Sequence, residues 1–149
     1  MLEKKDYPKP AYTADNLIIL IPDELKVNEK ILLIKRLNDP FKDCWALPGG
    51  YVNPDETSSE AARREAKEET NVDLPGLPKL IGIFDKPGRD PRGWVISAAY
   101  RWYVPQYFYS SFQAGDDAKE AQWFSLHDLP ENMAFDHLEI IKKYLYKDF

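Results

Sequence analysis

The sequence predicts an α/β domain in which helices pack on a mixed β-sheet. Short apolar segments typical of buried strands alternate irregularly with two segments of helical spacing. The 149 residues are 44% hydrophobic and 13% aromatic, so the chain is long enough to bury about two thirds of its unfolded surface in one core. We therefore expect residues 1–149 to form a single domain.

The first third of the chain is predicted to be β-structure. Residues 17–22 and 30–37 are apolar runs typical of buried strands, and the polar residues between them favour a turn. A third strand is expected over residues 44–50, which end in two glycines.

The first helix is predicted over residues 58–70. Thr57 and Glu60 have the spacing of a capping box, and good helix formers follow them. The inward stripe consists of small residues, Ala61, Ala62 and Ala66. Small residues allow a helix to approach a sheet closely, so we expect this helix to be held firmly in position.

Two further strands are predicted over residues 77–88 and 93–105. Asp90, Pro91 and Gly93 suit a type I turn between them, so the pair should form a hairpin. A last strand is expected over residues 120–126. The second helix is expected over residues 134–147, where apolar residues recur at helical spacing.

Composition excludes several functional classes. The formal net charge of -5 argues against a nucleic-acid partner. Neither terminus has a secretory signal or an apolar run of about 18 residues, so we expect a cytoplasmic protein without a membrane partner. Cys44, the one cysteine, is interpreted as a small buried hydrophobe, and His127 and His137 as surface or capping residues.

An acidic cluster lies within the first predicted helix. Glu65, Glu68 and Glu69 share one turn, where each like-charged pair costs about 0.2 to 0.5 kcal/mol on an isolated helix. One interpretation is a solvated helix whose own Arg and Lys residues balance these charges. The other is a metal site, because clustered carboxylates are the hard oxygen ligands that Mg²⁺ and Mn²⁺ prefer.

The wider spacing favours the metal site. The chain reads G-x5-E-x7-R-E-x-x-E-E in Gly50, Glu56, Arg64, Glu65, Glu68 and Glu69. This pattern resembles the Nudix box, the signature of hydrolases that cleave a nucleoside diphosphate linked to another group. The resemblance implies an α/β/α sandwich with a mixed β-sheet. Ala66 and Asn71 depart from the family pattern, but Asn tolerates the left-handed conformation expected at the end of the helix.

The resemblance also implies roles for the residues of the box. The carboxylates and one main-chain carbonyl would bind Mg²⁺ or Mn²⁺, through Gly50, Glu56, Glu65, Glu68 and Glu69. Arg64 would orient the glutamates by ion pairing, and Glu68 would also take part in catalysis. A bound metal explains why the like charges are tolerated.

In this family the general base usually lies outside the box. The acidic segment before the last strand offers Asp116, Asp117 and Glu120. We favour Glu120, then Asp117, as the residue that accepts the proton of the attacking water. A plain solvated turn is the alternative.

Substrate choice must also come from outside the box. Pro87 follows Val72 by 15 residues, and in this family a proline about there is typical of enzymes that hydrolyse ADP-ribose. Arg89 and Arg92 are candidates to bind a phosphate or ribose. Alternatively, they are solvated residues of a hairpin tip.

Aromatic residues of the second pair of strands are candidates to stack on the adenine. They are Phe84, Trp94 and Tyr100. The alternative is that these rings only pack within their strands.

The leading hypothesis is a cytoplasmic, homodimeric enzyme that splits ADP-ribose into AMP and ribose 5-phosphate. The first alternative is a Nudix hydrolase for another sugar nucleotide or an oxidised nucleotide. The second is a sensor that binds ADP-ribose without cleaving it, like related repressors. We expect an enzyme because every acidic residue of the box is kept, and because the chain ends soon after Tyr146 whereas those repressors carry an added DNA-binding domain.

Overall fold

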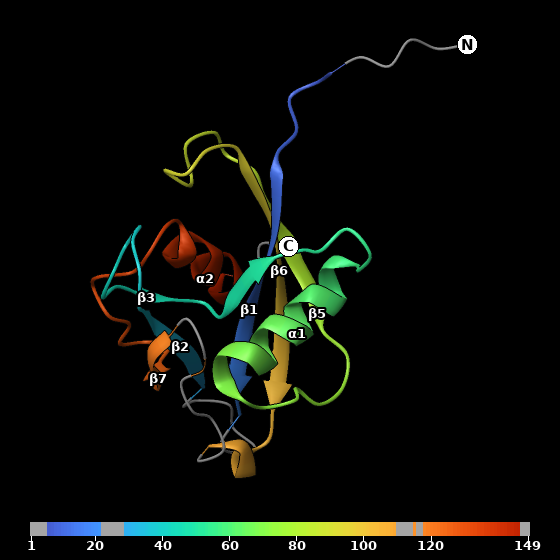
Figure 1. Cartoon of the computed structure of the whole chain (residues 1–149). Helices are drawn as coiled ribbons and strands as arrows, with labels where there is room; N and C mark the ends of the chain where they lie inside the picture. Colours follow the sequence, from blue (N-terminus) through green and yellow to red (C-terminus); the bar gives the residue numbers. More distant parts are fainter. Residues whose placement is uncertain (1–5, 22–28, 110–114, 116–117, 147–149) are drawn as a thin grey trace.

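The computed structural model describes residues 6–21, 29–109, 115 and 118–146 (Figure 1). In this part of the chain, seven strands form one sheet with two α-helices. In chain order the elements are β1 (Ala11–Leu20), β2 (Lys30–Arg36), β3 (Trp45–Ala46), β4 (Gly49–Tyr51), α1 (Ser58–Thr70), β5 (Lys79–Phe84), β6 (Val95–Val104), a 3₁₀ helix (Gln106–Phe108), β7 (Ala118–Ser125) and α2 (His137–Leu145).

The sheet is mixed, as predicted. β1 runs parallel to β6 along its whole length, from Ala11 opposite Val95 to Leu20 opposite Val104. The other pairings are antiparallel, and they include the expected hairpin of β5 and β6. Gly93 N–H donates to the Asp90 carbonyl at 3.3 Å, so the predicted turn is present in the connection.

The sheet splits along one edge of β1. One edge of β1 pairs with β6 along its whole length. β2 and β4 therefore both pair with the opposite edge of β1. β2 pairs with the C-terminal end of β1, at Ile19 and Leu20. β4 pairs with β1 further toward its N-terminus, at Thr13, Ala14 and Asp15. The two strands therefore diverge beside the middle of β1, which leaves an opening in the sheet.

The helices cover opposite faces of the sheet (Figure 1). Leu17 and Ile19 of β1 pack in one core cluster with α2, whereas Ile18 and Leu20 pack in a second cluster with α1. Successive residues of a strand point to opposite faces, which explains this division. The predicted α/β/α sandwich is therefore confirmed.

Local interactions define α1 as predicted. Thr57 Oγ1 accepts a hydrogen bond from Glu60 N–H at 3.2 Å, and the Glu60 carboxylate accepts one from Thr57 N–H at 3.0 Å. Asn71 ends the helix with a φ of 64°, and its N–H donates to the Lys67 carbonyl at 2.8 Å. The predicted small residues of the stripe, Ala61, Ala62 and Ala66, are fully buried.

Several predicted strand limits are wrong. β1 begins at Ala11 rather than Leu17, because pairing with β4 and β6 buries its polar residues. The strand predicted over residues 44–50 is two strands. Pro48 separates them, since it has no N–H to donate and its carbonyl accepts from Asn16 N–H at 2.8 Å.

The later limits also differ from prediction. β5 covers only Lys79–Phe84, and β7 begins at Ala118 rather than Glu120. α2 begins at His137 because Phe135 has a φ of 50°, which no residue of a right-handed helix adopts. Neither described helix has the length and apolar character needed to cross a membrane.

Candidate active site

A cavity of about 370 Å³ lies where β2 and β4 diverge. Its acidic wall comes from α1 and from the glycine turn that begins β4. Another part of the lining is formed by arginine and aromatic side chains from the end of β2, the β5–β6 connection and the segment before α2. Its inner end is formed by β1 and the first residue of α2. Widely separated segments therefore build this one pocket.

Close contact between glutamates and glycines forms the acidic wall. Glu69 is buried, and its Oε2 accepts a hydrogen bond from Gly49 N–H at 3.2 Å. The Glu65 carboxylate lies where a side chain at residue 50 would be, so a Cβ at Gly50 would overlap it. Of the four glutamates predicted to bind metal, Glu65 and Glu69 therefore line the pocket together with Gly50, whereas Glu56 and Glu68 are not among the described lining residues.

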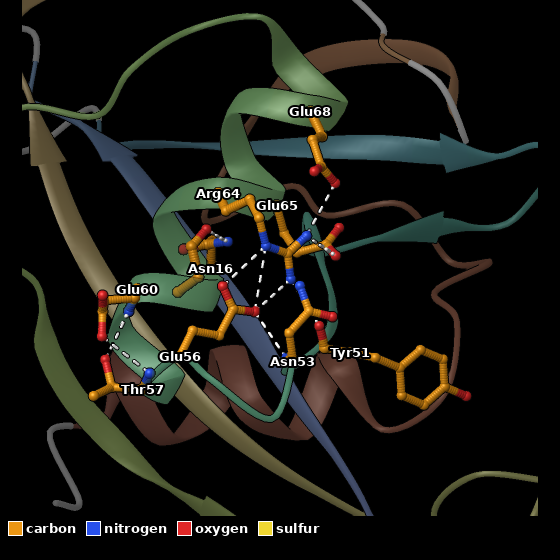
Figure 2. A network of polar contacts seen from close by, with 10 residues as sticks. Asn16, Tyr51, Asn53, Glu56, Thr57, Glu60, Arg64, Glu65 and Glu68 are labelled. Atoms are coloured by element: carbon orange, nitrogen blue, oxygen red, sulfur yellow. Dashed lines mark hydrogen bonds and ion pairs between the residues drawn. The ribbon is translucent and has the colours of Figure 1, made fainter.

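Arg64 connects the acidic residues of the box (Figure 2). Its guanidinium contacts the carboxylates of Glu56 at 2.6 Å, Glu65 at 2.8 Å and Glu68 at 3.1 Å. It also donates to the Tyr51 carbonyl at 2.9 Å. The hydrogen bond with Glu56, followed by those with Glu65 and Glu68, raises the pKa of Arg64, and the same contact lowers the pKa of Glu56. Arg64 thus orients three predicted site residues at once.

The side chain of Asn16 connects the glycine turn to α1 through hydrogen bonds. Its side chain is fully buried and donates to the carbonyls of Pro48 at 3.1 Å and Ala62 at 2.9 Å. Its Oδ1 accepts from Trp102 Nε1 at 2.7 Å. This network sets the distance between the helix and the turn. Sequence reasoning missed Asn16, which has no local pattern.

The arginines of the pocket lining contact aromatic rings. The guanidinium of Arg36 lies 5.0 Å, and that of Arg92 5.1 Å, from the centre of the Phe135 ring. Arg92 also lies 5.4 Å from the Tyr51 ring. These distances suit cation–π contacts. Sequence reasoning found Arg92 but missed Arg36, Phe135 and the ring of Tyr51.

The two predicted arginines both line the pocket, and both are ion-paired. Arg89 is bound to Asp136 through two hydrogen bonds of 2.6 and 2.9 Å, and its side chain is only 4% exposed. Arg92 is bound to Asp90 at 2.7 Å. Burial opposes ionisation of Asp90, but the hydrogen bonds from Arg92 outweigh burial and lower the pKa of Asp90. Arg92 is therefore the more accessible of the two cations.

Asp15 and His137 form the polar inner end of the pocket. Asp15 Oδ2 accepts from Ser97 Oγ at 2.5 Å, and Asp15 Oδ1 lies 3.6 Å from His137 Nε2. His137 Nδ1 accepts from Leu47 N–H at 3.0 Å. Burial lowers the pKa of His137, although Asp15 opposes this effect. The interpretation of His137 as a surface or capping residue is therefore wrong, because its ring is packed between β1 and the segment before β4.

Glu120, the first predicted base residue, lies apart from the cavity lining. In the described part of the chain, Glu120 is exposed on β7 opposite Lys35, and it does not line the pocket. Asp116 and Asp117 lie outside the described residues. Gly115 N–H donates to the Glu69 carbonyl at 2.6 Å, so the chain just before Asp116 contacts the end of α1.

The predicted adenine-stacking residues and Pro87 also lie elsewhere. Phe84 packs against the core cluster under α2, and the Tyr100 hydroxyl lies 2.5 Å from Ser58 Oγ. Pro87 and Trp94 are exposed. Among the described residues that line the pocket, none of these four appears.

The acidic wall suits a hard divalent cation by its chemistry. The carboxylates of Glu65 and Glu69 are hard oxygen donors, and Gly50, whose carbonyl is the predicted main-chain ligand, lines the same pocket. Within residues 6–21, 29–109, 115 and 118–146, no three His, Cys, Asp or Glu side chains already converge on one point. Arg64 holds Glu65 and Glu68, so a cation would compete with its guanidinium for these carboxylates.

Known proteins resemble this chain over most of its length. It is 44% identical to an ADP-ribose pyrophosphatase of Methanocaldococcus jannaschii, over 97% of the chain and 82% of that protein. It is 34% identical to the ADPR responsive transcriptional repressor NtrR of Acinetobacter baylyi, over 95% of the chain but only 55% of the repressor.

Structural comparison agrees. The NUDIX domain of Shewanella oneidensis NrtR, solved in complex with ADP ribose, superimposes with a TM-score of 0.81 at 27% identity, over 96% of this chain and 91% of that one. The family model of the NUDIX domain matches residues 16–144. This match includes the glycine turn, the acidic helix α1 and all of α2 except its last residue, Leu145. The chain therefore belongs to the NUDIX domain family.

Proposed function

We propose that this protein hydrolyses the diphosphate of ADP-ribose and releases AMP and ribose 5-phosphate. The observation that carries the proposal is a single pocket whose lining includes both glutamates and arginines. Such a pocket can hold a diphosphate between a cation-binding side and a cationic side. The 44% identity to an ADP-ribose pyrophosphatase supports this substrate.

We infer that the acidic wall binds Mg²⁺ or Mn²⁺ through Gly50, Glu65 and Glu69, with Glu56 and Glu68 as further ligands. A divalent cation supplies charge neutralisation for the diphosphate and lowers the pKa of the attacking water. The chain contributes the position of the ligands, because Arg64 and the glycine contacts hold the carboxylates in place.

Glu120, then Asp117, remains our proposal for the general base. The support for Glu120 is its place in the acidic segment that leads into β7, where it is exposed and pairs across the ladder with Lys35. Replacing the base by its amide should lower kcat by roughly two to four orders of magnitude and change KM little. Glu120→Gln and Asp117→Asn, measured side by side with Glu131→Gln as an exposed control, would assign the role. If both keep full turnover, a glutamate of the box must activate the water.

The geometry refines the proposed substrate contacts. Arg92 is accessible and would contact a phosphate, whereas the buried pair of Arg89 with Asp136 would fix the β5–β6 connection to α2. Phe135 and Tyr51 present rings at the pocket and would stack on the adenine in place of Phe84, Trp94 or Tyr100.

A substrate panel tests the proposed function. The protein should cleave ADP-ribose with Mg²⁺ present and not in excess chelator, with AMP and ribose 5-phosphate identified by mass spectrometry. Preference for another nucleoside diphosphate derivative or an oxidised nucleotide would favour the first alternative. Tight binding of ADP-ribose without turnover would favour a sensor, a function for which the 34% identity to a repressor is the specific support.

The cytoplasmic location and the homodimer remain predictions. Light scattering of the purified protein would determine its oligomeric state. Fractionation of cells would determine its location.

A further inference from the structure

We propose that Asp15 and His137 form a subsite for one hydroxyl group of the terminal ribose, and so contribute to substrate selection. This inference rests on the proposed hydrolysis of ADP-ribose. Both residues line the inner end of the pocket, with Asp15 6% and His137 5% exposed.

The two side chains present complementary groups to one point. Because Leu47 N–H donates to His137 Nδ1, the neutral ring carries its proton on Nε2. Nε2 lies 3.6 Å from Asp15 Oδ1, which is longer than an ordinary hydrogen bond. A hydroxyl group accepts one hydrogen bond and donates another, so it can bridge this donor and this acceptor.

Both side chains are already held in position. Ser97 Oγ donates to Asp15 Oδ2 at 2.5 Å, which directs Oδ1 toward His137. The hydrogen bond from Leu47 N–H fixes the orientation of the imidazole. Polar groups buried this deeply are nearly always hydrogen-bonded, so a preformed donor and acceptor at this spacing indicate a polar ligand.

The subsite lies beside the acidic wall. A Cβ at Gly49 would lie 2.5 Å from Asp15 Oδ1, and Gly49 N–H donates to Glu69 Oε2. Asp15 and Glu69 thus contact the same glycine from two sides. A group bound at Asp15 would be next to a diphosphate held at the acidic wall, which is where ADP-ribose carries its riboses.

Charge and shape favour the terminal ribose at this position. The Asp15 carboxylate would repel a phosphate, whereas it accepts a hydrogen bond from a hydroxyl group. The Tyr51 ring, which is exposed and lies 5.4 Å from the Arg92 guanidinium, suits the adenine side of the substrate, whereas the Phe135 ring lies 5.3 Å from that of His137. The inner end would then receive the ribose that carries no base.

Deoxy analogues of ADP-ribose test the subsite. For the wild-type protein, one analogue that lacks a single hydroxyl of the terminal ribose should show kcat/KM lower by roughly 10- to 150-fold than ADP-ribose. An analogue that lacks the 2′-hydroxyl of the adenosine should show a much smaller loss. If no terminal-ribose analogue is discriminated, or if only the adenosine analogue is, the subsite assignment is wrong.

Two variants attribute the discrimination to these residues. Asp15→Asn keeps the shape but would place an amide against the imidazole donor. His137→Asn keeps an acceptor for Leu47 N–H and deletes the Nε2 donor. Each variant should lose activity with ADP-ribose but match the wild type with the deoxy analogue, as in a double-mutant cycle. Equal losses with both substrates would indicate a structural role and overturn the inference.

Controls separate this inference from the proposed function. Asp73→Asn, an exposed Asp in an ion pair with Lys67, is the matched substitution and should leave the discrimination unchanged. Thermal unfolding would verify that each variant is folded. If the wild-type protein leaves ADP-ribose intact, the proposed function fails and the subsite with it. If it cleaves ADP-ribose without discriminating the analogues, only the subsite fails.

Discussion

Glu65 and Glu69 reach the pocket because Gly49 and Gly50 carry no side chains. The Glu69 carboxylate accepts from Gly49 N–H, and the Glu65 carboxylate covers Gly50. Neither glycine has a positive φ, so the requirement is for space rather than for a special backbone conformation. The absence of side chains at these two glycines therefore explains how the acidic wall packs against the turn.

Glu69→Gln should lower kcat by at least roughly 100-fold and leave the fold intact. Gln keeps an acceptor for Gly49 N–H but loses the anionic ligand. The measurements are turnover of ADP-ribose at saturating Mg²⁺ and the midpoint of thermal unfolding. Glu139→Gln, on the exposed side of α2, is the control. Full turnover by Glu69→Gln would contradict the metal-site proposal.

Gly50→Ala should lower kcat by roughly 100-fold, because the added Cβ displaces the Glu65 carboxylate from the wall. Its effect on stability should be small, since the end of a flexible side chain gives way. Gly76→Ala is the opposite case, with open space around it and a φ of 74°. It should lower the free energy of unfolding by about 1 kcal/mol and leave kcat unchanged. Equal activities of the two variants would refute the steric argument.

At the scale of elements, α1 combines strong local signals with a weak apolar face. Its buried stripe is alanine, so van der Waals contact with the sheet is close but small in area. A capping box, a left-handed Asn at the end and the Arg64 ion pairs compensate for the clustered glutamates. The helix is therefore held in position largely by polar contacts.

Thr57→Ala should lower the free energy of unfolding by about 1 kcal/mol, and the midpoint of thermal unfolding by about 2 to 4 °C. The reason is that Glu60 N–H loses its side-chain acceptor at the start of α1. Thr57→Ser keeps a hydroxyl and should lie close to the wild type. Calorimetry of the three proteins makes the comparison. A Ser variant as unstable as the Ala variant would show that the lost methyl group, not the cap, matters.

At the scale of the whole molecule, the divergence of β2 and β4 makes the cavity, and α2 closes its inner end. His137, the first residue of α2, connects the helix to the segment before β4 through Leu47. The ion pair of Arg89 with Asp136 ties the β5–β6 connection to the same place. The pocket thus depends on contacts among α2, the segment before β4 and the β5–β6 connection.

Acid should destabilise the fold through His137. Burial lowers the pKa of the folded-state imidazole, and Arg89 and Arg36 act in the same direction, although Asp15 and Asp136 oppose them. Below about pH 6.5, the ordinary pKa of histidine, the imidazole of the unfolded chain binds a proton that the buried imidazole of the folded chain does not yet bind. The stabilising contribution is therefore present above about pH 6.5 and is lost as the pH falls toward the folded-state pKa.

The measurement is the free energy of unfolding from about pH 7.5 to 5 for the wild type and His137→Asn. The stability of the wild type should fall more steeply than that of the variant, which lacks the imidazole. If the two curves are parallel, the pKa of His137 does not differ between the folded and unfolded states, and the prediction is wrong.

The sequence by itself determined the acidic side of this protein. The box, its capping residues and the Asn71 cap are local patterns, in which each residue interacts with partners a few positions away. Such spacing is visible without coordinates, and so was a mixed sheet with helices packed on it. The resemblance of the box implied that the helices lie on both faces. Strand limits were less predictable, because polar residues such as Thr13 and Asn16 are buried by segments distant in the sequence, which for Asn16 include α1.

Only the tertiary structure decided the other sides of the pocket. Ser97 and Asp15 are 82 residues apart, and Leu47 and His137 are 90 apart, so no local period links them. Arg36 and Phe135 meet for the same reason, whereas Phe84 and Tyr100, expected at the substrate, are used in packing. Contacts between distant segments depend on how the sheet splits and the helices cover it. Hydrophobic burial of the whole chain sets that arrangement, and no single motif encodes it.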